Sequence, residues 1–203
     1  MSALRKPAKL TVEEYLRIEN AAFERSEFYD GEMFAMAGAT GPHNLIKDNL
    51  VLELGNRLCG SGCRTASSDQ RVRTPNGLYT YPDVVVFCGR QAFDPLDAIT
   101  MTNPRAVVEV LSPSTAGYDR GPKLRQYQRV PGLVEVVLVA HDMMAVEVFT
   151  RQPDGRWVFA AFDDPAGEVE LPGLGVRISL ADVYRDALPP TPTRLDPPGP
   201  SEV

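Results

Sequence analysis

The spacing of apolar residues along the chain predicts three helices and a short fourth. Isoleucine and leucine recur at every fourth position over about 42–58, as on one helical face packed against a core: Ile46, Leu50, Leu54 and Leu58. The capping-box sequence TVEE at residues 11–14 predicts an earlier helix over 12–19. The sequence YDRGPKLRQYQRV, which Pro131-Gly132 ends, predicts a third helix, and a short one is expected near 180–186.

Apolar runs with strand-like spacing fill much of the remaining chain. Strands are expected on both sides of the Asp30-Gly31 turn, at 63–67, 70–74, 82–87 and 105–111, and in the sequences LVEVVLVA, MMAVEVFT, RWVFAAF and EVELP. Residues 89–104 read as a loop. The order helix, strands, helix, strands predicts an α/β or α+β fold with a central mixed β-sheet flanked by helices.

A single domain is expected over residues 1–186. The composition supports this, because 43% hydrophobic and 24% charged residues in a chain of 203 are ordinary values for one globular domain. The segment 187–203 is rich in proline and almost without apolar residues, so it is predicted to be a disordered tail.

The cysteines and the terminal sequences favour a cytoplasmic protein without a membrane partner. Cys59, Cys63 and Cys88 lack the spacing of a zinc site and are expected to be free thiols, as in a reducing compartment. The sequence MSALRKPAKL has no apolar signal core. No apolar run approaches the roughly 18 residues that a membrane span requires.

The net charge of −6 bears on which kinds of nucleic-acid-binding protein the chain can be. A protein that coats nucleic acid would be basic, so this class is disfavoured. An enzyme that acts on DNA is still compatible with the charge, because a cluster of acidic metal ligands makes a chain acidic.

Two carboxylates in apolar strands are the strongest candidates for chemistry. Asp83 follows Pro82 at the start of one strand, and Glu109 lies in the middle of another. Buried carboxylates are costly unless they are paired or bind a metal, and side chains alternate along a strand. If the two strands are neighbours, Asp83 and Glu109 can face one layer and share a divalent cation, Mg²⁺ or Mn²⁺.

A lysine after the second strand adds a third candidate. Lys123 follows Gly121-Pro122 and is expected in the first turn of a helix, where a positive charge opposes the helix dipole. Tyr127, four residues later, is expected on the same helical face. A locally unfavourable position is consistent with a functional lysine.

The segments YPDVVV, VVEVLSPST and DRGPKLRQY, in this order, resemble the PD-(D/E)XK nuclease superfamily. Within it they resemble the bacterial putative restriction-endonuclease family that was formerly a domain of unknown function. The segments ERSEFYDGEMFAMAG and GPHNLIKDNLVLEL extend the resemblance over about 10–150. It implies a restriction-endonuclease-like fold and metal-dependent hydrolysis of DNA phosphodiester bonds, with Asp83 and Glu109 as metal ligands. Compact nucleases often act on two strands as dimers, so a homodimer is expected.

The chain departs from the superfamily pattern at one position. Lysine is expected two residues after the glutamate, where this chain has Leu111. The resemblance therefore implies that Lys123 supplies the cation and acts with Asp83 and Glu109 in catalysis.

Several polar residues have two interpretations. Glu27 is either an outer metal ligand or a surface strand residue, and His43 either contacts phosphate or caps a helix. Asp69 either joins the site or forms an Asx turn. Glu53 is expected to be solvated. Three further residues are expected to have no catalytic part: Glu135, His141 and the core residue Trp157.

The sequence thus predicts a divalent-metal-dependent endonuclease acting on DNA. The alternative is a non-catalytic partner-binding or dimerisation module on the same fold, which the acidic charge and Leu111 favour. A third hypothesis is hydrolysis of a small phosphodiester.

Overall fold

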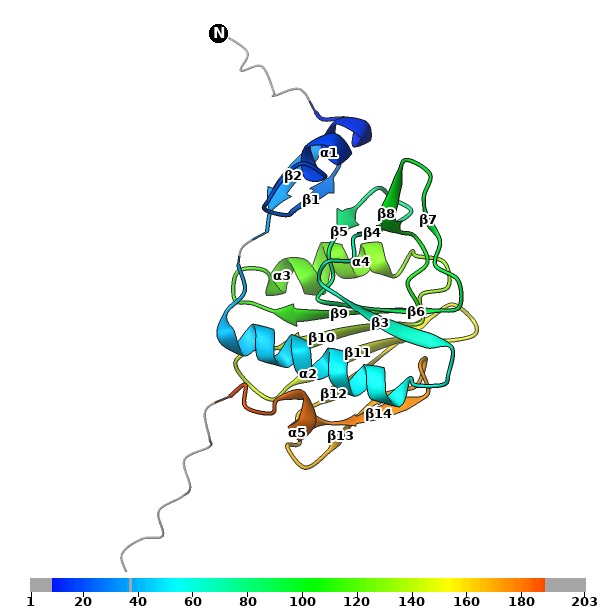
Figure 1. Ribbon diagram of the computed structural model, residues 1–203. Coiled ribbons are helices and arrows are strands. Elements are labelled where there is room, and N and C mark those ends of the chain that lie inside the picture. Colours follow the sequence, from blue (N-terminus) through cyan, green and yellow to red (C-terminus); the bar gives the residue numbers. More distant parts are fainter. Residues whose placement is uncertain (1–8, 37, 189–203) are drawn as a thin grey trace, which may run out of the picture.

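The chain forms a central six-stranded sheet, a second six-stranded sheet and a separate hairpin, with helices on both faces of the central sheet (Figure 1). This architecture comes from a computed structural model, which describes residues 9–36 and 38–188. From residue 189 on, the predicted tail lies outside the described residues, while Ala187 is buried in the core.

The central sheet is mixed, as the sequence predicts. Its strand order is β12-β11-β10-β9-β6-β3, in which β9 and β10 are parallel and every other neighbouring pair is antiparallel. The strands span Cys63–Ser67 (β3), Val84–Cys88 (β6), Ala106–Leu111 (β9), Glu135–Ala140 (β10), Val146–Arg151 (β11) and Trp157–Phe162 (β12).

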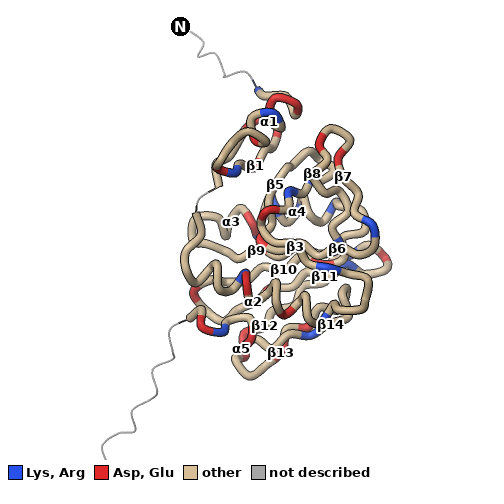
Figure 2. Tube along the Cα trace, viewed as in Figure 1, with Lys and Arg blue, Asp and Glu red and all other residues tan. Residues whose placement is uncertain are grey.

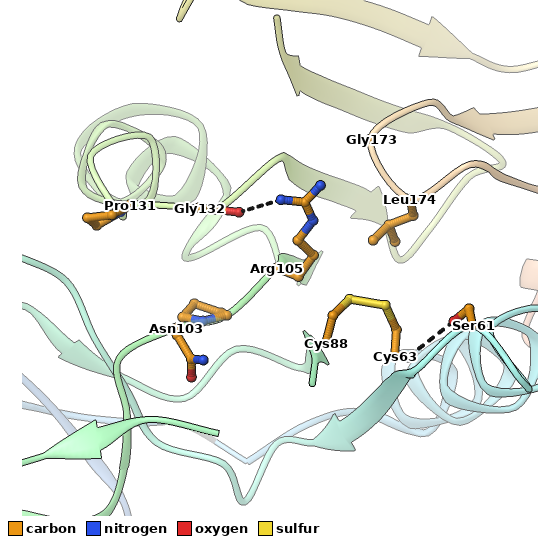
Figure 3. A pocket seen from close by; sticks show the side chains of 10 residues that line it. Ser61, Cys63, Cys88, Asn103, Arg105, Pro131, Gly132, Gly173 and Leu174 are labelled. Atoms are coloured by element: carbon orange, nitrogen blue, oxygen red, sulfur yellow. Dashed lines mark hydrogen bonds between the residues drawn. A yellow bond between two sulfur atoms is a disulfide. The ribbon is translucent and has the colours of Figure 1, made fainter. Parts of the chain in front are cut away.

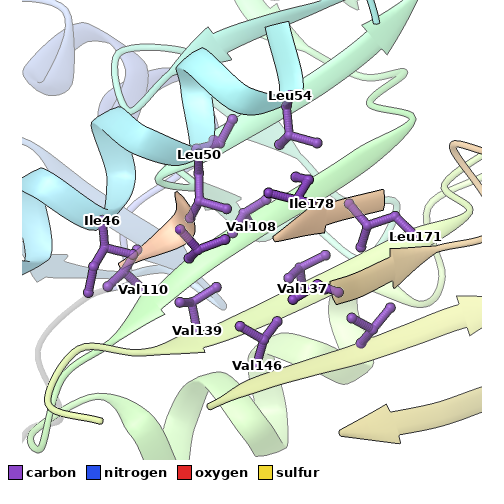
Figure 4. Packing of buried hydrophobic residues seen from close by; sticks show 14 of the residues in the cluster. Ile46, Leu50, Leu54, Val108, Val110, Val137, Val139, Val146, Leu171 and Ile178 are labelled. Atoms are coloured by element: carbon purple, nitrogen blue, oxygen red, sulfur yellow. The ribbon is translucent and has the colours of Figure 1, made fainter. Parts of the chain in front are cut away.

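Helix α2 (Gly41–Arg57) covers one face of this sheet. Its leucine and isoleucine stripe packs on the valines of β9 and β10, and the hairpin of β13 (Glu168–Leu171) and β14 (Val176–Ser179) closes the same core (Figure 4). The predicted helix over 42–58 is therefore confirmed. The short C-terminal helix is α5 (Leu180–Val183).

The other face of the central sheet is covered by a helical segment in three parts. Helix α3 (Ala116–Tyr118), the π-helical turn η1 (Asp119–Lys123) and α4 (Leu124–Tyr127) follow one another without a break. Leu124 and Tyr127 pack there against Val107 and Leu111 of β9. Lys123 consequently lies in the middle of the helical segment, so its predicted place in a first turn is wrong.

The second sheet, which includes the N-terminal strands β1 and β2, lies on the same side of the central sheet as the helical segment (Figure 1). Its order is β2-β1-β5-β4-β8-β7, and α1 (Val12–Glu19) packs on it with the predicted capping box at Thr11. The strands span Ser26–Tyr29 (β1), Glu32–Ala35 (β2), Val72–Arg73 (β4), Tyr79–Thr80 (β5), Phe93–Asp94 (β7) and Asp97–Met101 (β8).

The loop predicted at 89–104 is wrong, because β7 and β8 lie within it. This segment is shaped by buried polar contacts that apolar spacing does not reveal. Arg71, 1% exposed, pairs with Asp97, and Tyr79 donates a hydrogen bond to Asp94 at 2.9 Å.

The prediction of three free thiols is also wrong. Cys63 and Cys88 are direct partners in the β3–β6 ladder and form a disulfide, while Cys59 is free and exposed. The two cysteines are 25 residues apart, so only the pairing of the strands brings them together.

The disulfide lines a pocket of about 560 Å³ (Figure 3). The pocket lies at the end of β6 opposite to Asp83, and Arg105 is the one charged side chain in its lining. The guanidinium of Arg105 donates a hydrogen bond to the Gly132 carbonyl at 3.1 Å.

Within the described part of the chain, no helix has both the length and the apolarity needed to cross a membrane.

Candidate active site

The carboxylate of Asp83 contacts both strand β9 and the start of helix α2. Its Oδ2 accepts a hydrogen bond from the backbone N–H of Val110 at 2.8 Å, and its Oδ1 lies 2.9 Å from Nε2 of His43. Thr40 caps α2 by accepting from the backbone N–H of His43, so the imidazole is free to reach the carboxylate. His43 thus contacts Asp83 and does not itself supply the helix cap.

Glu109 lies across from Asp83 on the neighbouring strand. Val84 pairs with Val108, so the antiparallel register continued by one residue brings Asp83 opposite Glu109. Asp83 itself lies just before β6, and its carboxylate contacts His43 of α2 and the backbone N–H of Val110. The predicted proximity of the two strands is confirmed by this register.

The Glu109 side chain is 5% exposed and faces the helical segment. Its Oε1 accepts a hydrogen bond from the Tyr127 hydroxyl at 2.5 Å and lies 2.8 Å from Nζ of Lys123. Among the described residues, no hydrogen-bond partner engages its Oε2. One carboxylate oxygen is therefore held by the protein and the other is available.

Burial raises the pKa of Glu109 to about 8, against the opposing effect of Lys123. The negative charges of Asp119 and Asp83 add to the increase. Burial likewise raises the pKa of Tyr127, so its phenol stays protonated and acts as a hydrogen-bond donor.

Lys123 lies at the centre of a cluster of carboxylates. Its Nζ is 2.8 Å from Oε1 of Glu27, 2.8 Å from Oε1 of Glu109 and 3.6 Å from Oδ1 of Asp119. Burial by itself would lower the pKa of Lys123, but these carboxylates outweigh it and raise the pKa well above its ordinary value. The amine is therefore a cation at neutral pH.

The π-helical turn explains how Asp119 and Lys123 both reach the site. Pro122 has no N–H, and the backbone N–H of Leu124 donates to the carbonyl of Asp119, five residues back. Both side chains become buried on the inner face of the segment. Asp119 is the first residue of the segment DRGPKLRQY that carries the resemblance, but it was not recognised as a site residue. Its spacing of four residues from Lys123 is the clue that could have identified it.

Glu27 comes from β1 of the second sheet. It is 7% exposed, contacts Lys123, and accepts a hydrogen bond from the Thr80 hydroxyl. The interpretation of Glu27 as a surface strand residue is therefore wrong. Thr80 is a further residue of the site that sequence reasoning missed, since a lone threonine has no recognisable motif.

Leu111 points into the apolar cluster with Leu124 and Tyr127, two residues beyond Glu109 on the same face. Its side chain fills space that a lysine at this position would need. Lys123 approaches the same carboxylate from the helical segment instead.

Other polar residues lie outside the site. Asp69 is paired with Arg25. Glu53 is buried and paired with Arg57 and Arg185, so its predicted solvation is wrong. His141 follows β10 and lies 3.9 Å from Asp142.

Two residues expected to be structural lie in the β10–β12 part of the sheet. Glu135 is fully buried and accepts hydrogen bonds from the Thr150 hydroxyl and from the backbone N–H of Gly173. Burial raises its pKa to about 7. Trp157 is partly buried, with Arg151 over its ring.

Acidic residues (red) lie on the tube beside β9 and α4 (Figure 2). The ammonium of Lys123 lies near the carboxylates of Glu27, Glu109 and Asp119, whereas Asp83 contacts His43. Within residues 9–36 and 38–188, no three His, Cys, Asp or Glu side chains form a ready metal cage. Two carboxylates with water and substrate oxygens suffice for Mg²⁺, so this donor set fits a magnesium ion better than zinc.

Comparison with known proteins gives a consistent family match. The family model described as "Uma2: Putative restriction endonuclease" matches residues 12–181. The uncharacterized protein slr1290 of Synechocystis sp. is 35% identical over 181 residues, which cover 87% of this chain and 92% of that protein. A second protein of that organism, sll1609, is 34% identical over 167 residues, or 80% of this chain and 92% of that protein.

The fold also matches a solved structure. The crystal structure of a putative nuclease belonging to DUF820 from Anabaena variabilis has a TM-score of 0.71 and 21% identity. The match covers 90% of this chain and 100% of that one. The predicted restriction-endonuclease-like fold is therefore confirmed.

Proposed function

Because the chain belongs to the Uma2 family of putative restriction endonucleases, we propose that it is a divalent-metal-dependent endonuclease that hydrolyses phosphodiester bonds of DNA. The observation that carries the proposal is the ammonium of Lys123, 2.8 Å from Glu109, close to Asp83, whose carboxylate accepts the backbone N–H of Val110, the residue after Glu109. This arrangement combines a cation with two carboxylates in a buried, acidic site.

Asp83 and Glu109 would hold Mg²⁺ or Mn²⁺. The excess of carboxylates over cations supports this, because it leaves negative charge that a divalent ion neutralises. When bound, such an ion lowers the pKa of a water ligand and neutralises charge on a phosphate.

The residues of the chain have distinct proposed roles. Lys123, protonated at neutral pH, stabilises negative charge that develops on the phosphate, and its raised pKa argues against a role as general base. Tyr127 and Glu27 act as accessory residues that orient Glu109 and Lys123. His43 orients Asp83 through Nε2.

The test is cleavage of supercoiled plasmid DNA by the full chain with Mg²⁺ or Mn²⁺. We expect nicked and linear products that EDTA suppresses. Glu109→Gln and Lys123→Met should each lower the rate by about 10²–10³-fold. Glu109→Gln removes a charged metal ligand, and Lys123→Met removes the positive charge that stabilises the phosphate. Arg125→Ala is the matched control, since Arg125 is exposed on the same helical segment and should retain activity.

Circular dichroism of each variant separates loss of function from loss of fold. A folded, fully active Lys123→Met enzyme would refute the proposed role of the lysine. Cleavage that persists in EDTA would refute metal dependence.

The alternative is a non-catalytic module. The ion pairs of Lys123 with Glu27 and Glu109 favour it, because they already neutralise the lysine within the protein. Calorimetric titration with Mn²⁺ distinguishes the two. Binding that Asp83→Asn weakens, together with cleavage, supports the enzyme. Absence of both binding and cleavage in the folded wild-type chain supports the module.

Double-strand cleavage needs two sites, so we propose that the enzyme acts as a homodimer.

A further inference from the structure

The outer strand of the central sheet, β12, has a free edge without charged residues. It pairs with β11 in continuous register, and no other strand of the described residues pairs with it. Its sequence is WVFAAF, and Val158 and Phe159 are 51% and 55% exposed. Proteins usually protect such an edge by a charge, a proline or a bulge. Since β12 has none of these, its edge is suited to pairing.

We propose that this edge binds β12 of a second copy of the chain, in an antiparallel register centred on Ala160. The two central sheets then form one continuous sheet. The proposal rests on β12 and its flanking residues alone and does not depend on the chemistry of the carboxylate site.

Symmetry restricts the register. Opposed residues of neighbouring strands point to the same face of the sheet. A two-fold axis normal to the sheet leaves each side chain on the face that it has in the single chain. Because side chains alternate between faces along a strand, two opposed residues can share a face only if their numbers differ by an even number. Registers centred on a residue satisfy this condition, and those centred between two residues do not.

Charge and size select the register centred on Ala160. It sets Arg156 opposite Asp164 of the second copy, and both residues are exposed. Within one chain Arg156 pairs with Asp154 on the surface, so its guanidinium must turn to Asp164 or bridge the two carboxylates. The register also sets the large Phe159 opposite the small Ala161. The axis repeats each pair, so two Arg–Asp pairs lie at the ends of an apolar stretch.

The pairing of two six-residue strands buries a small area. Interfaces below about 1,200 Å² are typical of weak or transient complexes. We therefore expect a dimer that dissociates on dilution, with its mass dependent on concentration.

A cysteine at the axis tests the register directly. In Ala160→Cys, made in a Cys59→Ser background to remove the exposed thiol, residue 160 opposes its own copy. Opposed Cα atoms lie about 4.5–5.5 Å apart, within the range of a disulfide. Mild oxidation should give a covalent dimer. The matched control is Ala161→Cys, which should give far less, because residue 161 opposes residue 159 of the second copy and not residue 161.

Each other outcome counts against the proposal. Cross-linking that is equal at 160 and 161 indicates random collision. Preferential cross-linking of Phe159→Cys indicates a register shifted by one residue in each strand, and it overturns the charge argument. Absence of cross-linking at all three positions, with a monomeric mass at high concentration, overturns the pairing itself.

A charge swap tests the Arg156–Asp164 contact by light scattering. Arg156→Asp and Asp164→Arg should each raise the dimer dissociation constant by roughly tenfold, because each creates two like-charge contacts. The double variant should restore the dimer. If the two single variants dimerise like the wild type, the proposed register is wrong.

Discussion

At the scale of single residues, the buried charges of the site do not balance. One ammonium, that of Lys123, lies among the carboxylates of Glu27, Glu109 and Asp119. A buried carboxylate that lacks its own cation retains a proton to a higher pH. Burial is the main cause of the pKa of about 8 for Glu109, and the negative charges of Asp119 and Asp83 add to it. A bound divalent cation would replace the proton.

The raised pKa of Glu109 predicts how stability depends on pH. An unfolded glutamate releases its proton near pH 4.5, whereas Glu109 in the folded chain releases it near 8. Between these values the folded state binds more protons, so its contribution to stability is complete below about pH 4.5 and is lost as the pH rises through 8.

Urea unfolding measures this contribution. Without metal, the free energy of unfolding of the wild type should fall with pH relative to Glu109→Gln, by at most about 1.4 kcal/mol per pH unit. Glu135, with a pKa of about 7, acts in the same direction, so Glu135→Gln is the control and should retain the slope between pH 7 and 8. Equal slopes for wild type and Glu109→Gln would contradict the prediction.

Asp83 shows why an aspartate follows a proline at this strand start. Pro82 has no N–H with which to extend the ladder, and the carboxylate of Asp83 accepts the N–H of Val110 on β9. The Asp83 carboxylate thereby stabilises the strand end at the site, in addition to its proposed role as a metal ligand.

At the scale of elements, the π-helical turn decides which side chains reach the site. In a regular α-helix, i and i+4 residues already share a face, but Pro122 would clash with the preceding turn. The wider turn accommodates the proline while Asp119 and Lys123 remain buried together. Such turns frequently occur at functional sites.

Replacement of Pro122 should separate stability from function. Pro122→Ala restores an N–H donor and permits a regular α-helical turn, so helix stability should be kept or increased. The direction of Lys123 should change, and the cleavage rate and the Mn²⁺ affinity should both fall. Plasmid cleavage and calorimetry measure these effects, with the exposed Pro113→Ala as control. An unchanged rate and affinity would show that the π-turn is not required.

At the scale of the whole molecule, the site is assembled from distant parts of the chain. Glu27 comes from the N-terminal strands, Asp83 and Glu109 from the central sheet, and Lys123 from the helical segment. The second sheet therefore contributes directly to the site. Loss of packing between the two sheets would remove Glu27 from Lys123.

The disulfide is the covalent link within the central sheet. It joins Cys63 of the edge strand β3 to Cys88 of β6. A loop of 25 residues is closed, for which chain entropy predicts about 3.5 kcal/mol of stabilisation. Cys63→Ser with Cys88→Ser should lower the melting temperature, and a reducing agent should do the same to the wild type.

Cys59→Ser is the control for this experiment, because Cys59 is free and exposed and its loss should leave the melting temperature unchanged. The site lies at the other end of β6, so cleavage should persist in the double serine variant below its melting temperature. Identical melting of the oxidised and reduced wild type would contradict a stabilising disulfide.

Elements whose signals are local can be predicted from the amino-acid sequence. The four-residue repeat of α2, the capping box of α1 and the valine runs of β6 and β9 each encode their structure over a few residues. The positions of Asp83, Glu109 and Lys123 as candidates also follow from the sequence, because charged residues stand out next to apolar runs.

Contacts between residues far apart in the chain become apparent only in the folded molecule. The burial of Glu27, the contact of Asp119 with Lys123, the Cys63–Cys88 pairing and the strands within 89–104 all depend on segments far apart in the chain. Local spacing fixes the face on which a side chain lies. The partner across that face is fixed only when strands pair in register and the two sheets and the helices pack together.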